Sequence, residues 1–332
     1  MTPSDTSFSP PSMEAIKACK ARIAPYVLET PVAVWPGAEA AALWGQETAV
    51  IAKLELLQRT GTFKPRGALN VMMHLSAEEK ARGVTAVSAG NHAIAVSYAA
   101  SILGLSAKVV MHKAANPFRV SQCRRFGAEV VLAEDISKAF DEVNRIREAE
   151  GRAFVHPFDG PYTVEGTATV GLELDSQAGA LDAVIVPIGG GGLISGVAAA
   201  IKQRQPGCKV YGVEPDGAQG MTQSLAAGEP MAKVEVKTIA DSLGAPLHMP
   251  HTFAIVQRLV DEVVQVDDQA LIDAMGLSFR EMKLAVEPAG AAAVAALAGP
   301  LRQRLAGKRV GLIVCGTNID PASFCELVGR DS

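Results

Sequence analysis

One lysine, Lys64, lies where the sequence predicts that a strand gives way to a helix. Residues 49–57 are mostly apolar and predict the strand, and Gly61 permits the turn that must follow it. Pro65 lacks an amide hydrogen and suits the first turn of a helix, which we expect to run to Leu75. The pattern therefore holds the Lys64 amine at a defined point of the fold.

An amine at such a junction can act as a covalent catalyst. Burial, or a nearby cation such as Arg66, disfavours the charged ammonium and lowers the pKa of a lysine. The neutral amine of Lys64 can then form a Schiff base with a carbonyl cofactor. The alternative interpretation is a solvated lysine in a surface loop, because most lysines are exposed.

A run of four glycines suggests a phosphate site. Gly189, Gly190, Gly191 and Gly192 follow the strand predicted over residues 183–187 and precede a predicted helix. Backbone amides without side chains in front of them, next to a helix N-terminus, favour a bound phosphate. The spacing is neither GxGxxG nor a P-loop. A flexible connector without function is the alternative, although four glycines lose much conformational entropy on folding.

A polar loop follows the strand predicted over residues 85–88, and it consists of Ser88, Ala89, Gly90, Asn91 and His92. Its last residues open a predicted helix, whose free backbone amides can hold a carboxylate. An ordinary Asn cap in a strand-to-helix turn is the alternative.

The last predicted strand, residues 308–315, ends in Cys315, which we expect at the carboxyl edge of a sheet. A buried structural thiol is the alternative for this residue. Glu214 and Glu287 also follow apolar runs. Capping or pairing at the surface is the ordinary expectation for both glutamates.

Composition limits the class of protein. A chain of 332 residues is long enough for two lobes, because single cores stop growing at about 250 to 300 residues. With 48% hydrophobic but only 5% aromatic residues, the core should consist of aliphatic side chains between sheets and helices. The net charge is −4, and no basic run suggests a nucleic-acid or anionic membrane surface. A small molecule is therefore the expected partner.

The five cysteines are widely spaced, which argues against a disulfide framework or a zinc site. Residues 1–13 lack the pattern of a secretory signal and read as a loose arm. The longest uncharged run, residues 183–201, contains Pro187 and five glycines and would make a poor membrane helix. We therefore expect a cytoplasmic protein.

Short apolar runs alternate with helical patterns along the chain, which predicts parallel strands joined by helices. Strands are expected over residues 49–57, 85–88, 107–111, 129–132, 153–156, 183–187, 209–214, 262–266 and 308–315, and helices over residues 65–75, 93–103, 117–126, 136–148, 193–204 and 267–283, with an alanine-rich helix after residue 291. The expected fold is α/β, with two open parallel-sheet lobes and a ligand at the carboxyl ends of the strands.

Taken together, the motifs resemble those of the serine/threonine dehydratase and serine racemase family. They are Thr62-Phe-Lys-Pro-Arg-Gly-Ala68, Ser88-Ala-Gly-Asn-His92, Gly189-Gly-Gly-Gly-Leu193, Val213-Glu-Pro215, Glu287-Pro-Ala-Gly290 and Cys315-Gly-Thr-Asn318. Members are pyridoxal 5′-phosphate enzymes of the tryptophan synthase β fold (fold type II). The resemblance runs from about Ile23 to the last strand and is greatest to the short catabolic type. It implies a large cofactor-binding domain over residues 1–79 and 159–332, a small domain over residues 80–158, and the cofactor between them.

The resemblance also implies roles for single residues. Lys64 would be the Schiff-base lysine and Phe63 would pack on the cofactor ring. Asn91 would hydrogen-bond the 3′-oxygen of the cofactor, and Gly189, Gly190, Gly191, Gly192 and Leu193 would hold its phosphate. Ser88, Ala89, Asn91 and His92 would surround the substrate carboxylate, and Cys315 would face the pyridine nitrogen. A homodimer is the oligomer that the resemblance implies.

Cys315 bears on the type of reaction. A neutral thiol does not hold a pyridine protonated as an aspartate would, so the ring is a weaker electron sink. Loss of the Cα proton together with a β leaving group suits such a site better than transamination. We therefore expect a lyase that converts serine, threonine or a bulkier 3-hydroxy amino acid into a 2-oxo acid and ammonia, with Lys64 as the base.

Three alternatives stay open. The first is a racemase: the racemases that this family resembles carry a second serine where this chain has Ala89, and alanine cannot transfer a proton. A β-replacement synthase more often has Lys-Asp-Arg where this chain has Lys64-Pro65-Arg66. A non-catalytic protein that binds a phosphate ester through the glycine run would not need Lys64.

Some segments depart from the family pattern. Residues 165–169 and the pair Gly316-Thr317 differ from the usual Ala-Gly-Gln-Gly-Thr and Gly-Gly, which leaves substrate choice open. The divalent metal site of some relatives would fall on Glu214, Ala218 and Gly220, where the second carboxylate is missing. We therefore predict no divalent metal, while a water-rich site or a site for a monovalent cation at Glu214 stays open. Residues 238–246 resemble a segment that lies near the substrate.

Overall fold

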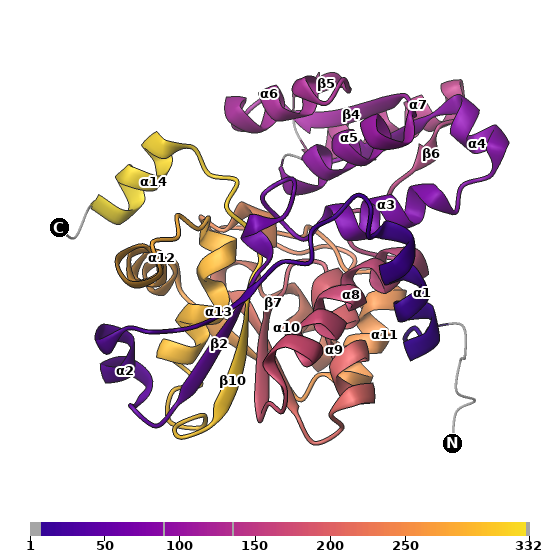
Figure 1. The fold of residues 1–332 in the computed structure, drawn as a ribbon. Helices are drawn as coiled ribbons and strands as arrows, with labels where there is room; N and C mark the ends of the chain where they lie inside the picture. The colour runs from indigo at the N-terminus through magenta and orange to yellow at the C-terminus, as the bar shows by residue number, and fades with distance from the viewer. Residues whose placement is uncertain (1–7, 89, 135, 330–332) are drawn as a thin grey trace.

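The protein folds into two lobes, each built on a parallel or mostly parallel sheet (Figure 1). The structure is a computed structural model that describes residues 8–88, 90–134 and 136–329. Within these ranges no helix is long and apolar enough to cross a membrane. The sheet of the small lobe uses only strands between residues 84 and 154, whereas the large lobe takes strands from both sides of that segment. The domain boundaries at residues 79/80 and 158/159 stay a prediction.

Six strands form the sheet of the large lobe, in the order β1-β2-β10-β7-β8-β9. They are β1 (Val32–Val34), β2 (Ala49–Leu54), β7 (Ala183–Pro187), β8 (Lys209–Pro215), β9 (Glu262–Val266) and β10 (Arg309–Val314). All neighbours are parallel except β1, which pairs antiparallel with β2 at the edge. Because β10 lies between β2 and β7, the carboxyl ends of three strands that are distant in sequence meet at one edge.

Four parallel strands form the sheet of the small lobe, in the order β5-β4-β3-β6. They are β3 (Val84–Val87), β4 (Ala107–His112), β5 (Glu129–Ala133) and β6 (Ala153–Phe154). Successive side chains of a strand face opposite sides of the sheet. Accordingly Ala86 and Val109 pack with one group of buried residues, and Val87 and Val110 with another that includes Val143.

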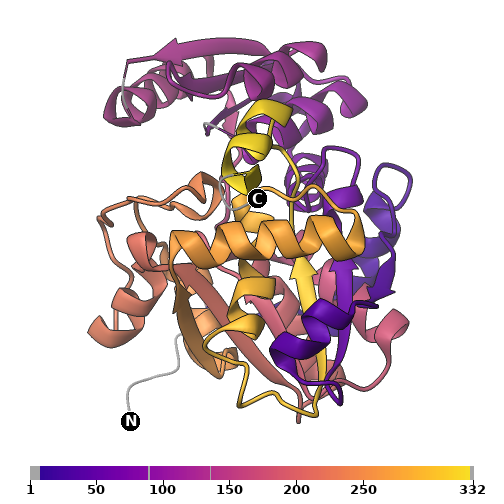
Figure 2. The ribbon, with the colours of Figure 1, turned by 90° about the vertical axis from the view of Figure 1, so that its left-hand side faces the viewer.

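Helices cover both sheets (Figures 1 and 2). They are α1 (Met13–Ile23), α2 (Ala38–Trp44), α3 (Pro65–Met73), α4 (Ala77–Arg82), α5 (Asn91–Leu103), α6 (Pro117–Arg125), α7 (Ile136–Glu150), α8 (Pro161–Ala178), α9 (Gly192–Arg204), α10 (Gly220–Ala227), α11 (Pro250–Leu259), α12 (Asp268–Met282), α13 (Pro288–Ala298) and α14 (Pro321–Val328). Helix α13 packs on β7 and β10, while α9 packs on β7 and against α8. In Figure 1, α13 and α9 lie on opposite sides of the large sheet.

The order of the predicted strands and helices is confirmed, β1 had not been predicted, and three strands are shorter than expected, among them the strand predicted over residues 308–315, which is Arg309–Val314. The strand predicted over residues 49–57 ends at Leu54, and Glu55–Leu57 form a 3₁₀ helix. The strand predicted over residues 153–156 is reduced to Ala153–Phe154. Several helices, above all α8, had no counterpart in the prediction.

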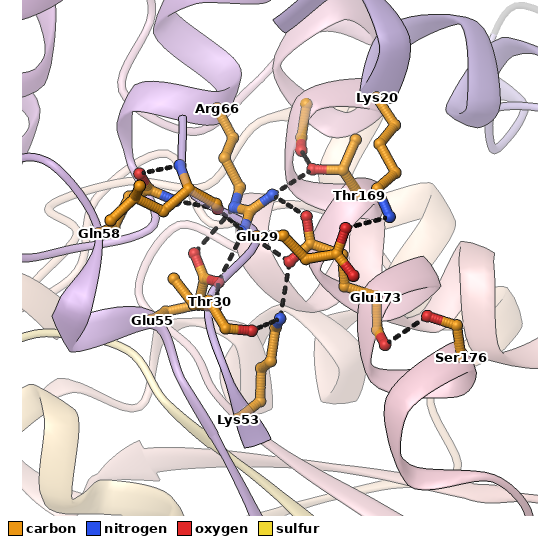
Figure 3. A network of polar contacts seen from close by, with 12 residues as sticks. Lys20, Glu29, Thr30, Lys53, Glu55, Gln58, Arg66, Thr169, Glu173 and Ser176 are labelled. Carbon is orange, nitrogen blue, oxygen red and sulfur yellow. Dashed lines mark hydrogen bonds and ion pairs between the residues drawn. The ribbon is translucent and has the colours of Figure 1, made fainter. Parts of the chain in front are cut away.

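Four buried charged side chains cross-link the large lobe behind Lys64 (Figure 3). Arg66 on α3 donates to Glu55 from Nε and Nη2, both at 2.8 Å. It also donates to Glu173 on α8, at 2.7 and 2.8 Å. Lys53 on β2 donates to Glu173 at 2.6 Å. Two cations therefore face two anions, so that no charge of these buried side chains is left unpaired.

The network explains why β2 stops where it does. Lys53 is the next-to-last residue of β2, and Glu55 begins the 3₁₀ helix that follows. Both side chains are fully buried, because the change of backbone direction turns Glu55 toward Arg66. The junction that precedes Lys64 is thus held by side chains from β2, α3 and α8.

Removing one carboxylate should destabilise the large lobe strongly. Glu173→Ala leaves Arg66 and Lys53 with a missing partner, and breaking a buried ion pair lowers the free energy of unfolding by about 3–5 kcal/mol. Glu78→Ala is a matched control, because Glu78 pairs with Arg82 at the surface and such pairs contribute at most about 1 kcal/mol. Urea unfolding followed by circular dichroism compares the two. Equal midpoints for both variants would contradict the assignment.

Candidate active site

A cavity of about 660 Å³ lies between the two lobes. Loops that follow strands of both sheets form its walls, so Ser88 after β3, Gly189 after β7 and Cys315 after β10 face the same space. Lys64, which precedes the first residue of α3, lines it as well. The segments that the sequence singled out for their chemistry therefore converge, although they are far apart in the chain.

Lys64 is held in the cavity wall by its own hydrogen bond. Its Nζ donates to the carbonyl oxygen of Pro157 at 2.6 Å and lies 5.3 Å from the centroid of the Phe63 ring. Burial lowers the pKa of Lys64 to about 8, while Cys315 and Glu287 nearby oppose this shift. About half of the amine is therefore neutral near pH 8, well below the pH at which an ordinary lysine loses its proton, and the neutral form is the one that acts as a nucleophile or a proton acceptor.

Arg66 is not the cation that lowers the pKa of Lys64, contrary to one reading of the sequence. Its guanidinium points away into the charged network, where Glu55 and Glu173 balance it. Burial disfavours the charge of Arg66, but the two carboxylates outweigh it and raise its pKa. Arg66 therefore anchors the turn, and burial sets the pKa of the lysine.

The glycine run forms a tight turn between β7 and α9. Gly191 has φ of 93°, in the left-handed region that favours glycine. A Cβ on Gly190 would overlap the ring of Phe158, and one on Gly192 would overlap the Phe158 carbonyl oxygen. Because only hydrogen fits at these positions, no side chain of the run can cover its backbone amides. The loop thus fits a small anionic group such as a phosphate at the N-terminus of α9.

Asn91, the first residue of α5, is fixed by hydrogen bonds at both ends of its amide. Its Nδ2 donates to Ser242 Oγ at 3.0 Å and to Glu287 Oε1 at 2.6 Å. Its Oδ1 accepts from Asn318 Nδ2 at 2.7 Å. The side chain lines the cavity. A ligand that binds to Asn91 must therefore replace one of these protein partners.

The other residues of the polar loop differ in what they offer. Ser88 Oγ accepts from the backbone amide of Gly90 at 3.2 Å and lines the cavity. His92 Nε2 lies 2.8 Å from the carbonyl oxygen of Val155, and burial lowers the pKa of His92 to about 3. His92 is thus a neutral ring that joins α5 to the end of the small sheet. Ala89 lies outside the described residues.

Cys315 is a buried neutral thiol at the end of β10. Its Sγ donates to the carbonyl oxygen of Ala289 at 3.3 Å. Burial, together with the charge of Glu287, raises the pKa of Cys315 far above its ordinary value. The thiol therefore brings no negative charge into the cavity at neutral pH.

Two charged residues of the cavity wall, Arg119 and Glu287, were not expected there from the sequence. Arg119 on α6 of the small lobe pairs with Asp241 and donates from Nε to the carbonyl oxygen of Asn318 at 3.0 Å. Its Nη2 lies 3.5 Å from Glu287, which is buried instead of lying at the surface. Burial raises the pKa of Glu287 to about 7. Arg119 carries no local sequence signal, whereas Asp241 and Ser242 belong to residues 238–246, which line the cavity as that resemblance implies.

Glu214 is also buried and is used within the large lobe. Its carboxylate accepts from the backbone amides of Met221 and Thr222, at 2.7 and 2.9 Å, and from Thr222 Oγ1 at 2.8 Å. The first turn of α10 thus satisfies this carboxylate. Over the described part of the chain, no cluster of three or more His, Cys, Asp or Glu side chains could hold a metal ion.

One end of the cavity is apolar. Its wall, called the apolar annex here, consists of Val87, Val110, Ala139, Phe140, Val143 and Phe154. These residues come from β3, β4, α7 and β6 of the small lobe and border its second group of buried side chains. The six side chains of the annex are apolar and suit an apolar substituent, while His112, Asn144 and Arg147 of the same elements line the cavity beside them, with the Arg147 guanidinium 5.2 Å from the centroid of the Phe154 ring.

Comparison with known proteins gives a consistent assignment. Residues 23–316 match the family model described as pyridoxal-phosphate dependent enzyme. The chain is 52% identical to a phenylserine dehydratase of Ralstonia pickettii, over 99% of both chains. It is 39% identical to the catabolic L-threonine dehydratase of Escherichia coli (strain K12), over 84% of this chain and 86% of that one. Its structure is similar to that of maize serine racemase, with a TM-score of 0.88, 36% identity and coverage of 98% and 100%.

The lowered pKa of Lys64 should be measurable by chemical labelling. In protein freed of cofactor, an amine-selective acylating reagent should label Lys64 half-maximally near pH 8, because a group with a lowered pKa loses its proton earlier as the pH rises. Peptide mass mapping at a series of pH values measures the rate at which Lys64 is labelled, with exposed Lys17 as an internal reference. In Glu287→Gln the midpoint should fall further, since a carboxylate that favours the ammonium is lost. A midpoint near the ordinary value of 10.5 would contradict the burial argument.

Proposed function

The chain belongs to the family of pyridoxal-phosphate dependent enzymes, and on that premise we propose that it dehydrates 3-hydroxy amino acids to 2-oxo acids and ammonia. The observation that carries the proposal is the convergence of Lys64, the glycine run and the neutral thiol of Cys315 on one cavity. Relatives named as dehydratases over nearly the whole chain support it.

The residues present fit pyridoxal 5′-phosphate. The backbone amides of Gly189, Gly190, Gly191, Gly192 and Leu193 would hold its phosphate, Lys64 would carry it, and Phe63, Asn91 and Cys315 would surround its ring. When bound, the cofactor withdraws electrons from the α-carbon of an attached amino acid. For Asn91 to reach the cofactor, its amide must exchange the bond to Ser242 or to Glu287 for one to the ligand.

Lys64 and Cys315 favour elimination. A lysine with a pKa of about 8 has a much larger neutral fraction at neutral pH than a lysine with the ordinary pKa of 10.5, and so Lys64 is the base that removes the Cα proton. Cys315 offers no negative charge to keep a ring nitrogen protonated. The site therefore stabilises a full carbanion poorly and favours departure of the β-hydroxyl as the Cα proton leaves. The hydroxyl needs a proton to depart as water, and the glycine run would hold the cofactor phosphate as the source of that proton.

The substrate carboxylate is assigned to the start of α5. Ser88 lines the cavity there, and the first amides of a helix attract an anion. His92 orients this loop through Val155. Arg119, although close, is already occupied by Asp241 and Asn318.

The apolar annex indicates a substrate with a bulky apolar group on the β-carbon. A relative that is 52% identical over 99% of the chain is named a phenylserine dehydratase, which supports the same size class. Burying an aromatic ring against apolar walls contributes roughly 1.5–3 kcal/mol. We therefore place 3-aryl-3-hydroxy amino acids first among the substrates, ahead of serine and threonine.

Relatives include serine racemases, so racemisation is the second candidate. Alanine at position 89 has no proton to transfer, which ranks racemisation below dehydration. We also propose that the protein is a homodimer and works in the cytoplasm. Measurement of its molecular mass in solution tests the dimer.

Activity and cofactor attachment should both depend on Lys64. The purified protein should show the visible absorbance of the bound cofactor and release equal amounts of ammonia and 2-oxo acid from phenylserine, threonine or serine. Lys64→Ala should keep its circular dichroism spectrum, lose that absorbance and release no ammonia, since the carrier and the base are both removed. Borohydride reduction and peptide mapping should locate the cofactor on Lys64. An active alanine variant, or a replacement product formed with an added thiol without ammonia, would overturn the assignment.

The annex should control the choice of substrate. Phe140→Ala removes an aromatic wall and should lower kcat/KM for phenylserine about tenfold, which corresponds to about 1.4 kcal/mol of lost contact. The value for serine should change less than about twofold, because a small side chain does not fill the annex. Phe118→Ala on α6 is a matched control, since this phenylalanine is exposed and outside the cavity wall. Equal losses for both substrates would show that Phe140 acts only on stability.

A further inference from the structure

The segment that follows β6 places three aromatic rings in one row along the cavity. Phe154, His156 and Phe158 alternate along the chain and all line the cavity. The ring centroids of Phe154 and His156 are 5.8 Å apart and those of His156 and Phe158 are 4.6 Å apart, both edge to face. Lys64 donates to the backbone of Pro157, so the row runs directly beside the reactive amine.

The backbone fixes the tautomer of His156. The amides of Phe158 and Asp159 approach His156 Nδ1 at 3.3 and 2.9 Å. Backbone N–H groups only donate, so Nδ1 is the acceptor and Nε2 carries the hydrogen of the neutral ring. Burial lowers the pKa of His156 to about 4, aided by Lys64 and opposed by Asp159. At neutral pH the ring is therefore uncharged and has one N–H to donate.

That N–H is available to a ligand. Among the described residues, no hydrogen-bond partner of His156 Nε2 is found, while the ring lines the cavity. Two neighbouring hydroxyls already donate: Thr167 Oγ1 to the carbonyl oxygen of Gly192 at 2.7 Å, and Ser242 Oγ to Asp241 Oδ1 at 3.3 Å. His156 is thus a neutral side-chain donor of the cavity wall that is not already in use, as is the hydroxyl of Ser88 at the polar loop, and it is the one that lies in the aromatic row beside Lys64.

The position of His156 in the row indicates which part of a bound substrate lies next to its ring. Phe158, on one side, touches the glycine run that fits a phosphate. Phe154, on the other side, belongs to the apolar annex that suits the β-substituent. A substrate held between these two points, with its α-carbon near Lys64, presents its β-carbon to the middle of the row. The polar group on that carbon is the 3-hydroxyl.

We propose that His156 recognises the 3-hydroxyl of the substrate through its Nε2–H and thereby selects the configuration at C3. The inference rests on the proposed function and assigns a specificity-determining residue to it. With the aryl group in the annex, only one configuration at C3 directs the hydroxyl toward His156. The imidazole donates a hydrogen bond and keeps its proton, because transfer would leave a buried anion. His156 orients the C–O bond and does not protonate the leaving group.

Two substitutions separate recognition from folding. In His156→Asn, the side-chain oxygen can still accept from the amides of Phe158 and Asp159, but no donor reaches the position of Nε2. In His156→Gln, the amide nitrogen can reach that position. Each holoenzyme is assayed with the threo and erythro diastereomers of phenylserine, and phenylalanine, which lacks the 3-hydroxyl, is measured as a competitive inhibitor.

We expect His156→Asn to lower kcat/KM for the preferred diastereomer about tenfold or more, as for a lost hydrogen bond in a buried site, and to bring the two diastereomers closer together. Inhibition by phenylalanine should stay within about twofold of the parent enzyme. His156→Gln should recover part of the preference. This combination is not produced by a change in stability, which would weaken both ligands alike.

The outcomes distinguish the two proposals. If the parent enzyme dehydrates 3-hydroxy amino acids but His156→Asn keeps the diastereomer preference, the role of His156 is wrong and the proposed function stands. The same holds if phenylalanine and phenylserine weaken equally, or if the Gln variant behaves like the Asn variant. If the parent enzyme releases no 2-oxo acid from any 3-hydroxy amino acid, the proposed function fails and the inference fails with it.

Discussion

The buried charge network of Arg66, Glu55, Glu173 and Lys53 is the constraint on which the site depends (Figure 3). Arg66 is two residues beyond Lys64, so the four ionic contacts that fix its guanidinium also fix the backbone that presents the lysine. The desolvation cost of each ion is large, and only a complete set of partners offsets it. A displacement of any of the three contributing elements would leave a buried ion without a partner and raise the free energy of the fold. The turn is therefore kept in one conformation.

A second constraint is steric and acts on the opposite wall. The glycine run and Phe158 are so close that no side chain fits between them, and Phe158 in turn belongs to the segment whose carbonyl holds Lys64. The loop that fits a phosphate and the amine that would carry the cofactor are thus adjusted to each other through residues 157 and 158. The shape of the cavity therefore depends on the contacts that residues 157 and 158 make with the glycine run and with Lys64.

The sequence predicted those parts of the site that have local signatures. The turn at Lys64, the glycine run and the polar loop at Asn91 each follow an apolar strand, and strand ends of a parallel sheet meet at one edge. Helix α8 was not predicted, because its glycines and threonines have low helix propensity. They are required by packing instead, since a Cβ on Gly166 would overlap the backbone of Arg66 and one on Gly171 would approach Val197 O to 2.8 Å. Glu287 and Arg119 gain their roles only from neighbours that are distant in sequence, whereas His156 is fixed by adjacent residues and gains its role from the cavity that it lines.

The two lobes contribute different things to the cavity. The groups that fit the cofactor, apart from Asn91, lie on the large lobe, whereas the apolar annex is built from α7 and the strands of the small lobe. Replacements in α7 can therefore change the accepted side chain without disturbing the charged network or the glycine run. Natural selection can therefore change the range of substrates without changing the residues that carry out the reaction. A gene that encodes it has an accessible route to new substrates by mutation of a single helix.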